Sequence, residues 1–425
     1  MKVDSILKPY QRFGVNLGLD RIQKLLKNLG NPHKKVPIIH VAGTNGKGSV
    51  CAYVSSILTA AGYRVGRYIS PHLIDWNERI CINQKPISSE ELEDCLLQVV
   101  NAIDKDGESP TQFEVFTAAA WLYFAEKKVD IAVIEVGLGG RLDATNVCET
   151  PLASIITSIS REHWQVLGPT LADIAGEKAG ILKQNCSAVI GQLPSEAKAV
   201  IQKRLEQLNC PTIWPKPAVD LGKHWAEYQP DLASSAVTIK YPLPLLGSIQ
   251  LMNSALAIAT CQILQQQGWT ISETAIQNGM ANTKWPGRLQ WTTWRNHKIL
   301  VDGAHNPAAA IALREYVDTL DNLYPQKQGK SWVMGMLSTK DHADIFKALL
   351  ESGDRLYLVP VPDHSSAEPE ELAKLALTIV SDLSHCQTYP DLVAGLDSAI
   401  IDDNLVVLCG SLYLAGYFFQ QQGKD

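Results

Sequence analysis

The stretch from His40 to Ser49, HVAGTNGKGS, constrains the fold more than any other part of this chain. A short apolar run at 36–39 precedes it, and residues 50–62 follow with apolar side chains at helical spacing. A glycine-rich turn between a strand and a helix lets backbone N–H groups approach an anion, and the helix N-terminus adds partial positive charge. Lys47 can reach terminal phosphates and Ser49 can bind Mg²⁺, so the stretch predicts a nucleotide phosphate site.

The same stretch departs from the strict phosphate-binding pattern G-x-x-x-x-G-K-[ST] at two positions. Val41 stands at the place of the first glycine, and Gly48 separates Lys47 from Ser49. The alternative interpretation is a glycine-rich turn that holds no ligand. The strand before the turn and the helix after it favour phosphate binding.

Composition limits the kinds of partner that this chain can have. Its 425 residues, 46% apolar and 19% charged, are enough for two domains, which we place at residues 1–288 and 289–425. A formal charge of −6 and the lack of a long apolar run argue against nucleic-acid and membrane partners. Nine scattered cysteines without a C-x-x-C pair, and no secretory segment at the start, predict a cytoplasmic protein, which we expect to be a monomer.

Apolar runs alternate with helical patterns through the first domain. Residues 129–136 and 152–159 are almost wholly apolar, as strands covered on both faces would be. A helical pattern at 113–124 precedes the first run, and a helix start at Thr170 follows the second. This alternation predicts an α/β domain of P-loop ATPase type with a mostly parallel sheet.

A second alternation of strands and helices starts near Ile299. Apolar runs near Trp332, Leu356 and Leu405 predict its further strands. We therefore expect a smaller, Rossmann-like α/β domain at the C-terminus. Residues 210–247 are less regular and predict loops with some antiparallel strand.

Several polar residues stand at or after predicted strand ends, where parallel sheets collect ligands. Glu135 is a candidate Mg²⁺ ligand, with a structural salt bridge as the alternative. His163 is a candidate ligand or a hydrogen-bonded structural histidine. Lys178 would ordinarily be a solvated helix lysine, and residues 302–307, DGAHNP, would ordinarily form a tight turn with a helix cap.

Seven motifs together resemble the folylpolyglutamate synthase and dihydrofolate synthase family of the Mur ligase superfamily. They are, in the family's order, HVAGTNGKGS, SPHL, EVGLGGRLDATN, GEKAGI, PGRLQ, DGAHNP and the late CGS. Each motif is modest alone. Together they extend over nearly the whole chain and are highly specific.

The resemblance implies an enzyme that uses ATP and Mg²⁺ to join L-glutamate to dihydropteroate and to the γ-carboxylate of reduced folates. ATP would phosphorylate the acceptor carboxylate, a poor electrophile, and the glutamate amine would then displace phosphate. Two alternatives stay open: a folylpolyglutamate synthase only, and a P-loop nucleotide-binding module or switch without ligase chemistry. DGAHNP and PGRLQ count against the second, because a switch needs no second-domain nucleotide residues.

The resemblance also implies roles for individual residues. The nucleotide would be bound by Thr44, Asn45, Gly46, Lys47, Gly48, Ser49, Asn253, Arg288 and Asp302. The metal ligands would be Ser49, Ser70, Glu135 and His163, supported by a carbamylated Lys178. The acceptor would meet Pro9, Tyr10, Gln11, Arg12, Thr111, Gln112, Phe113, Glu114, Leu142, Asp143 and Ala144, and glutamate would lie near His305 and Ser411. Lys47, Lys178 and His305 would be the catalytic residues.

Overall fold

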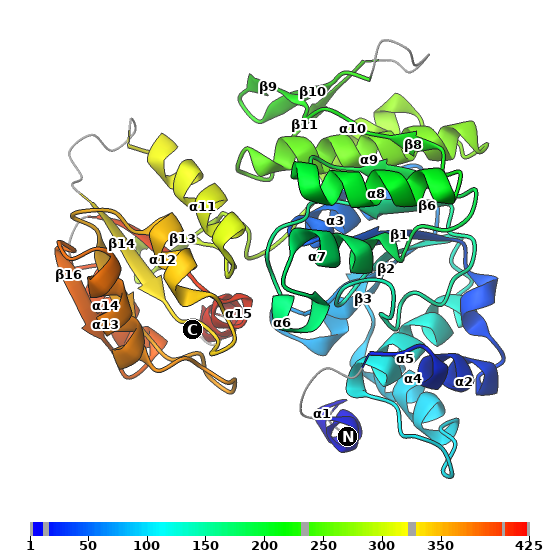
Figure 1. Cartoon of the computed structure of the whole chain (residues 1–425), viewed down its shortest axis with the longest axis horizontal. Coiled ribbons are helices and arrows are strands. Elements are labelled where there is room, and N and C mark those ends of the chain that lie inside the picture. Colours follow the sequence, from blue (N-terminus) through cyan, green and yellow to red (C-terminus); the bar gives the residue numbers. More distant parts are fainter. Residues whose placement is uncertain (1–2, 12–16, 231–237, 322–328, 402–403, 423–425) are drawn as a thin grey trace. The chain divides into compact units, whose positions relative to one another are not determined.

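The computed structural model describes residues 3–11, 17–230, 238–321, 329–401 and 404–422, which form two structural units (Figure 1). The first unit runs to Pro244 and also includes Gln250–Lys284. The second unit takes Leu245–Ile249 and the chain from Trp285 onward. Both units are α/β structures built on a largely parallel sheet, which confirms the predicted fold class. The predicted division after residue 288 stays a prediction.

The apolar runs of the first unit form the centre of an eight-stranded sheet with the order β4-β3-β2-β5-β1-β6-β7-β8. The strands are β1 Ile38–Ala42, β2 Val65–Tyr68, β3 Ile80–Ile82, β4 Lys85–Pro86, β5 Ile131–Glu135, β6 Ala153–Ile156, β7 Ser187–Ile190 and β8 Thr212–Ile213. From β2 to β8 in this order all pairs are parallel, whereas β3 pairs antiparallel with both β2 and β4. Strand β1 is central, so its C-terminal end lies between those of β5 and β6.

Helices surround this sheet, and a small antiparallel sheet with the order β11-β10-β9 lies beside α10 (Figure 1). The helices are α1 Val3–Leu7, η1 Lys8–Tyr10, α2 Asp20–Asn28, η2 Pro32–Lys35, α3 Lys47–Ala60, η3 Trp76–Arg79, α4 Ser89–Asn101, α5 Gln112–Glu126, α6 Trp164–Leu167, α7 Leu171–Ala179, α8 Ser195–Gln207, α9 Ile249–Gln266 and α10 Glu273–Ala281. The small sheet consists of β9 Val219–Gly222, β10 Trp225–Tyr228 and β11 Ile239–Pro242, as predicted for 210–247.

Packing fixes the helix that follows the glycine-rich turn. Ten consecutive α3 residues, from Ser49 to Leu58, are buried, which is typical of a helix enclosed on all sides. Gly279 of α10 allows the closest approach, because a Cβ there would lie 2.3 Å from the Cα of Ile57. The Ser56 hydroxyl also donates to the carbonyl of Gly279 at 2.7 Å. These contacts fix the C-terminal half of α3 against α10.

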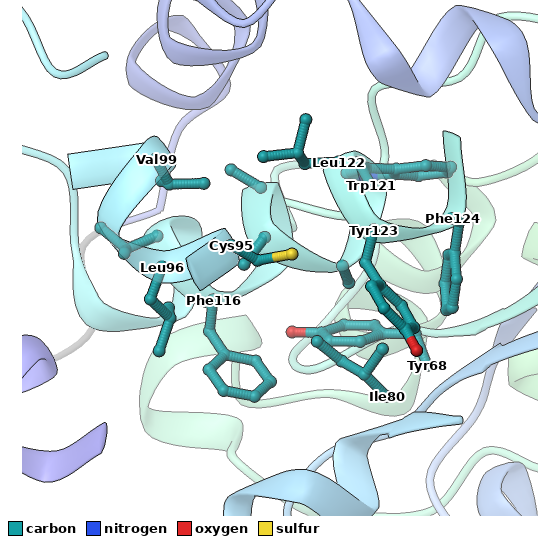
Figure 2. Packing of buried hydrophobic residues seen from close by; sticks show 14 of the residues in the cluster. Tyr68, Ile80, Cys95, Leu96, Val99, Phe116, Trp121, Leu122, Tyr123 and Phe124 are labelled. Atoms are coloured by element: carbon teal, nitrogen blue, oxygen red, sulfur yellow. The ribbon is translucent and has the colours of Figure 1, made fainter. Parts of the chain in front are cut away.

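A second apolar cluster joins α4 and α5 to the sheet (Figure 2). Figure 2 shows Cys95, Leu96 and Val99 of α4 facing Phe116 and neighbouring α5 side chains, with Tyr68 and Ile80 of the strands beneath. Burial of each large side chain contributes about 1.5–3 kcal/mol to the stability of this part of the unit. The cluster fixes the start of α5, where four of the predicted acceptor residues lie.

The second unit contains a six-stranded sheet with the order β12-β13-β17-β14-β15-β16, in which only β12 is antiparallel to its neighbour. Its strands are β12 Gln290–Trp294, β13 His297–Val301, β14 Lys330–Met334, β15 Arg355–Leu358, β16 His385–Thr388 and β17 Leu405–Cys409. Its helices are α11 Pro307–Thr319, α12 His342–Leu349, α13 Pro369–Ile379, α14 Leu392–Ala399 and α15 Leu412–Gln422. The strands predicted near Ile299, Trp332, Leu356 and Leu405 are confirmed.

Helix ends follow the local sequence closely. Ser88 and Thr170 each cap a helix within a capping box, and the helix start predicted at Thr170 is confirmed. Helix α9 starts at Ile249, so Asn253, a predicted nucleotide residue, lies inside the helix. Among the residues that the structure describes, no helix is both long enough and apolar enough to cross a bilayer.

Candidate phosphate and metal site

The turn between β1 and α3 has a shape that only glycine allows at two positions. Gly46 has φ 86°, and a Cβ there would lie 2.4 Å from Oδ1 of Asn253. Gly43 has φ 150°, and its Cβ would lie 1.9 Å from Oγ1 of Thr157. Asn253, a predicted nucleotide residue, therefore lies directly against the turn. The absence of side chains at both glycines lets Asn253 and Thr157 pack directly against the backbone of the turn.

The loop after β6 holds this turn in place. The backbone N–H of Thr44 donates to the carbonyl of Ser158 at 2.8 Å, and that of Asn45 donates to the Ser158 hydroxyl at 3.0 Å. The Thr157 hydroxyl donates to the carbonyl of Asn45 at 2.6 Å. The Thr44 hydroxyl lies 3.1 Å from the N–H of Ser160, which donates to it. The turn is thus preorganised, which lowers the cost of binding an anion.

Two lysine amines meet at one carbonyl of the turn. Nζ of Lys47 donates to the carbonyl oxygens of Gly43 at 3.1 Å and Thr44 at 3.2 Å. Nζ of Lys178, from α7, donates to the same Gly43 oxygen at 2.8 Å. Lys178 is only 5% exposed, so its interpretation as a solvated helix lysine is wrong. Gly48 and Ser49 lie in the first turn of α3, beside the Lys47 backbone.

The pKa of Lys178 is lowered to about 7, by burial first and by the charge of Lys47 second, while Glu162 and Asp143 act in the opposite direction. The first of these causes is the largest because a buried ammonium loses its hydration. A large fraction of this amine is therefore uncharged near neutral pH. An uncharged amine is a nucleophile, which a solvated lysine is not at this pH.

Oxygen donors that suit Mg²⁺ lie at the ends of the neighbouring strands. Glu135, the last residue of β5, is 6% exposed, and its Oε2 accepts from the N–H of Ser70 at 3.3 Å. Val41 of β1 is the register partner of Glu135, so the carboxylate stands beside the strand that leads to Ser49. Mg²⁺ takes one or two carboxylates and completes its shell with water and phosphate oxygens. The described residues contain no cluster of three His, Cys, Asp or Glu, the type of site that transition metals prefer.

His163 has a less enclosed position than the other candidate ligands. It follows β6 by seven positions and precedes α6, with φ 51° in the left-handed region. Its side chain is 49% exposed, and Nε2 lies 3.9 Å from Oε1 of Glu162. Its role as a ligand stays a prediction.

The predicted acceptor residues of α5 combine capping with an ion pair. The Thr111 hydroxyl accepts from the N–H of Glu114 at 3.2 Å, and Oε2 of Glu114 accepts from the N–H of Thr111 at 2.6 Å. Arg21 of α2 donates to the same carboxylate oxygen at 3.1 Å. The other oxygen, Oε1, is buried and has no hydrogen-bond partner among the described residues. Gln112, the first residue of α5, is half-buried.

The N-terminal segment and the loop after β5 approach the same region. Tyr10 packs against the cluster of Figure 2, next to Pro9 and Gln11, whereas Arg12 lies outside the described residues. The Phe113 ring covers the backbone of Gly137, where a Cβ would lie 2.5 Å from the ring. The structure thus brings the start of α5 and this loop together.

Asp143 organises the loop that contains Leu142 and Ala144. Its carboxylate accepts from the N–H of Leu138 at 2.8 Å, the N–H of Thr145 at 3.0 Å and the Thr145 hydroxyl at 2.6 Å. Burial raises the pKa of Asp143, and these hydrogen bonds act against that shift. Leu142 accepts a long hydrogen bond, 3.4 Å, from the N–H of Gly18, and Ala144 is buried. Sequence reasoning missed the partner of Thr145, which is the buried His40.

In the second unit, a buried carboxylate follows β13. Asp302 accepts from the N–H of Leu289 at 2.8 Å and from that of Ala304 at 2.7 Å. Burial raises the pKa of Asp302, and the neighbouring charges of Arg288 and His305 lower it. The predicted nucleotide residues Arg288 and Asp302 therefore do lie together.

The predicted glutamate residues lie on adjoining loops of the same unit. His305 contacts the carbonyl of Gly303 through Nδ1 at 2.7 Å, and the N–H of Gly410 donates to the carbonyl of Ala304 at 2.9 Å. Ser411 follows and is buried, at the C-terminal end of β17. Asn306 caps α11, with Pro307 in its first turn, so the helix-cap interpretation holds for that part of the motif.

Comparisons with known proteins agree with this arrangement. Residues 41–261 match the family model of the Mur ligase middle domain, and residues 288–421 match that of the dihydrofolate synthetase C-terminal domain. A probable dihydrofolate synthetase of Schizosaccharomyces pombe is 37% identical over 97% of this chain and 99% of that protein. A dihydrofolate synthase/folylpolyglutamate synthase of Bacillus subtilis is 34% identical over 95% of this chain and 94% of that protein.

Solved structures give the same result. The structure of Mycobacterium tuberculosis folylpolyglutamate synthase complexed with ADP has a TM-score of 0.88 to this chain, at 30% sequence identity. The match covers 100% of this chain and 98% of the other.

Proposed function

The chain belongs to the family of dihydrofolate synthases and folylpolyglutamate synthases, which are Mur-type ATP-dependent ligases, and from this we propose its two reactions. The first joins L-glutamate to dihydropteroate to give dihydrofolate. The second joins glutamate to the γ-carboxylate of a reduced folate. In both, ATP phosphorylates the acceptor carboxylate, and the glutamate amine attacks the acyl phosphate, from which phosphate leaves.

The proposal rests on one observation. The amines of Lys47 and Lys178 both donate to the Gly43 carbonyl, which belongs to a preorganised turn at the N-terminus of a buried helix. Phosphoryl transfer needs little covalent help from a protein and depends on positioning and on neutralised charge. Lys47 supplies a positive charge close to the turn, and the N–H groups of Gly46 to Ser49 supply a field that favours an anion.

The oxygen donors near the turn fit a magnesium ion bound with the nucleotide. We propose Ser49, Ser70, Glu135 and His163 as its holders, and the ion would neutralise charge on the transferred phosphoryl group. Glu135 is buried and receives the Ser70 N–H, so the carboxylate is oriented. Localisation of the protein in the cytoplasm and its action as a monomer belong to the same proposal.

We also propose that Lys178 reacts with carbon dioxide to form a carbamate. The neutral amine attacks the carbon, a C–N bond forms while the π electrons of one C=O bond move to its oxygen, and one proton of the amine is released to solvent. The low pKa of Lys178 supplies the neutral amine, and the product replaces a cation beside Lys47 with an anion. The repulsion between the two lysines would thereby become an attraction.

The remaining proposed roles are those that the resemblance implies. We propose that Asn253, Arg288 and Asp302 bind the nucleotide, and that His305 and Ser411 bind the incoming glutamate. Pro9 to Arg12, Thr111 to Glu114 and Leu142 to Ala144 would line the acceptor. The contact between Phe113 and Gly137 supports the last of these groups, because it joins one of its segments to the loop that contains Leu142 to Ala144.

The deciding experiment supplies ATP and glutamate with dihydropteroate or tetrahydrofolate, and follows phosphate release and product mass. We expect phosphate and a product heavier by one glutamate with each acceptor. Product from tetrahydrofolate alone would establish a folylpolyglutamate synthase only. Nucleotide binding without product from either acceptor would favour a binding module and contradict the ligase proposal.

A further inference from the structure

A histidine lies in the middle of the central strand, where the neighbouring positions are apolar. His40 is 1% exposed, and all five residues of β1 are buried. Burial lowers the pKa of His40 to about 3, and the charge of Lys183 adds to that shift. The imidazole is therefore uncharged at physiological pH, and its burial is costly unless its N–H has a partner.

That partner is a threonine in the loop after β5. Nε2 of His40 lies 2.9 Å from Oγ1 of Thr145, and this hydroxyl lies 2.6 Å from Oδ1 of Asp143. Both oxygens of Asp143 accept backbone N–H groups, so the Thr145 hydroxyl donates to this carboxylate, and Nε2 of His40 carries the proton that it donates to Thr145. The chain of donors runs in one direction, from β1 into the loop.

The loop that receives these hydrogen bonds connects several functional segments. It starts two residues after Glu135, and Asp143 closes it by accepting the Leu138 N–H. The N–H of Arg141 donates to the carbonyl of Glu177 at 2.8 Å, next to Lys178 on α7. Its Leu142 carbonyl accepts from Gly18, as described above. His40 thus fixes the loop to the strand that leads into the phosphate turn.

We propose that His40 is a positioning residue for the acceptor: through Thr145 and Asp143 it sets the loop at 137–146 relative to the phosphate turn. The inference rests on the proposed ligase function. The hydrogen bond of the His40 side chain goes to Thr145, which is neither a predicted nucleotide residue nor a predicted acceptor residue, so His40 acts through Thr145 and takes no part in proton transfer. Its loss should weaken the use of the acceptor and leave nucleotide binding intact.

The test uses pairs of variants that keep or remove one hydrogen bond. His40→Gln and Thr145→Ser keep the donor and the hydroxyl, and His40→Leu and Thr145→Val remove them. We expect the removing variants to lower kcat/KM for the acceptor about tenfold to a hundredfold, the effect of one buried polar group left without its partner. The KM for ATP and the affinity for ADP by calorimetry should change less than about twofold, an insensitivity typical of groups outside a binding site.

Two further measurements separate positioning from other roles. The His40→Leu/Thr145→Val double variant should be no worse than Thr145→Val alone, because Thr145→Val already removes the hydrogen bond to His40 together with the one to Asp143. The pH profile of His40→Gln should match that of the wild type, since the imidazole stays uncharged; a shifted profile would indicate acid–base catalysis and overturn the inference. A loss in the use of ATP as large as the loss in kcat/KM for the acceptor would also overturn the inference.

Hydrogen exchange gives a readout that does not depend on turnover. Peptides covering 137–146 should exchange faster in His40→Leu and Thr145→Val than in the keeping variants, while peptides of α8 stay unchanged. Unchanged exchange in the loop would contradict the inference even if the wild type ligates glutamate. If the wild type ligates no acceptor, the proposed function fails and with it the acceptor role, whereas the exchange result still shows whether His40 holds the loop.

Discussion

The amine of Lys178 and the carbonyl oxygen of Gly43 are joined by a hydrogen bond of 2.8 Å, and the amine of Lys47 shares that oxygen. Two ammonium groups cannot share one buried acceptor without strong repulsion. The pKa of Lys178, lowered to about 7, resolves the conflict because one of the two amines readily gives up its proton. This arrangement makes Lys178 the most informative residue to change.

Replacement of Lys178 by alanine should lower kcat about a hundredfold or more, the size of effect expected when a charged group of a phosphoryl-transfer site is lost. In wild-type protein, removal of carbon dioxide from the buffer should lower the rate reversibly, and ¹³C-labelled bicarbonate should give a carbamate signal by NMR. Lys203→Ala, on the exposed side of α8, is the control and should keep full activity. A full rate without carbon dioxide, together with no carbamate signal, would contradict the modification.

Stability should depend on pH through the same lysine. Its pKa is about 7 in the folded chain and near 10.5 when unfolded, so between these values the unfolded chain binds more protons. The free energy of unfolding of the wild type, relative to Lys178→Met, should therefore rise with pH from 7 to 10 by at most about 1.4 kcal/mol per unit. Below pH 7 the difference should be constant. Urea unfolding in carbon-dioxide-free buffer measures the free energy of unfolding of both proteins. A difference between them that falls as the pH rises would contradict the prediction.

Glu135 and Lys47 should be needed for turnover but not for folding. Glu135→Ala and Lys47→Ala remove a candidate metal ligand and a candidate phosphate contact, and each should lower the rate by about a thousandfold, as loss of a group that stabilises developing charge does. Glu135→Gln should raise the magnesium concentration needed for half-maximal rate, whereas Lys47→Ala should mainly weaken nucleotide binding.

Thermal unfolding should stay within about 5 °C of the wild type, the shift expected for about 1–2 kcal/mol in a chain of this size. Glu126→Ala, at the end of α5, is the control, and near-normal turnover in either site variant would refute the assignment.

Local sequence patterns predicted the parts of the site that depend on neighbours along the chain. The strand at 38–42, the turn and the helix at 47–60 are local features, because buried strands need apolar runs and glycine permits the turn. Glu135 at a strand end follows from the same pattern. The capping of helices by Ser88 and Thr170 can also be predicted from the sequence, because each capping residue and its hydrogen-bond partner lie within one helical turn.

Features set by tertiary packing could not be predicted in this way. The burial of Lys178 depends on the Gly43 carbonyl, 135 positions away, and the pair of His40 and Thr145 is separated by 105 positions. Strand β16, with the sequence HCQT, lies at the sheet edge and is only partly buried, so it shows no apolar run. Strand β12 was also missed, because three of its five residues are Gln or Thr.

The glycine at 46 provides the sharpest test of the turn, because two separate effects of a side chain can be distinguished there. Gly46→Ala should abolish nucleotide binding by calorimetry, since its Cβ would lie 2.4 Å from Oδ1 of Asn253, at a φ of 86°. Gly30→Ala is the matched control: its φ is 77°, but nothing lies within 4 Å of its Cβ. Both variants should lose about 1 kcal/mol of stability from the left-handed backbone alone, and only Gly46→Ala should lose the nucleotide. If Gly46→Ala bound nucleotide as tightly as Gly30→Ala, the phosphates would have to lie away from this turn, and the assignment of Thr44 to Ser49 would fail with it.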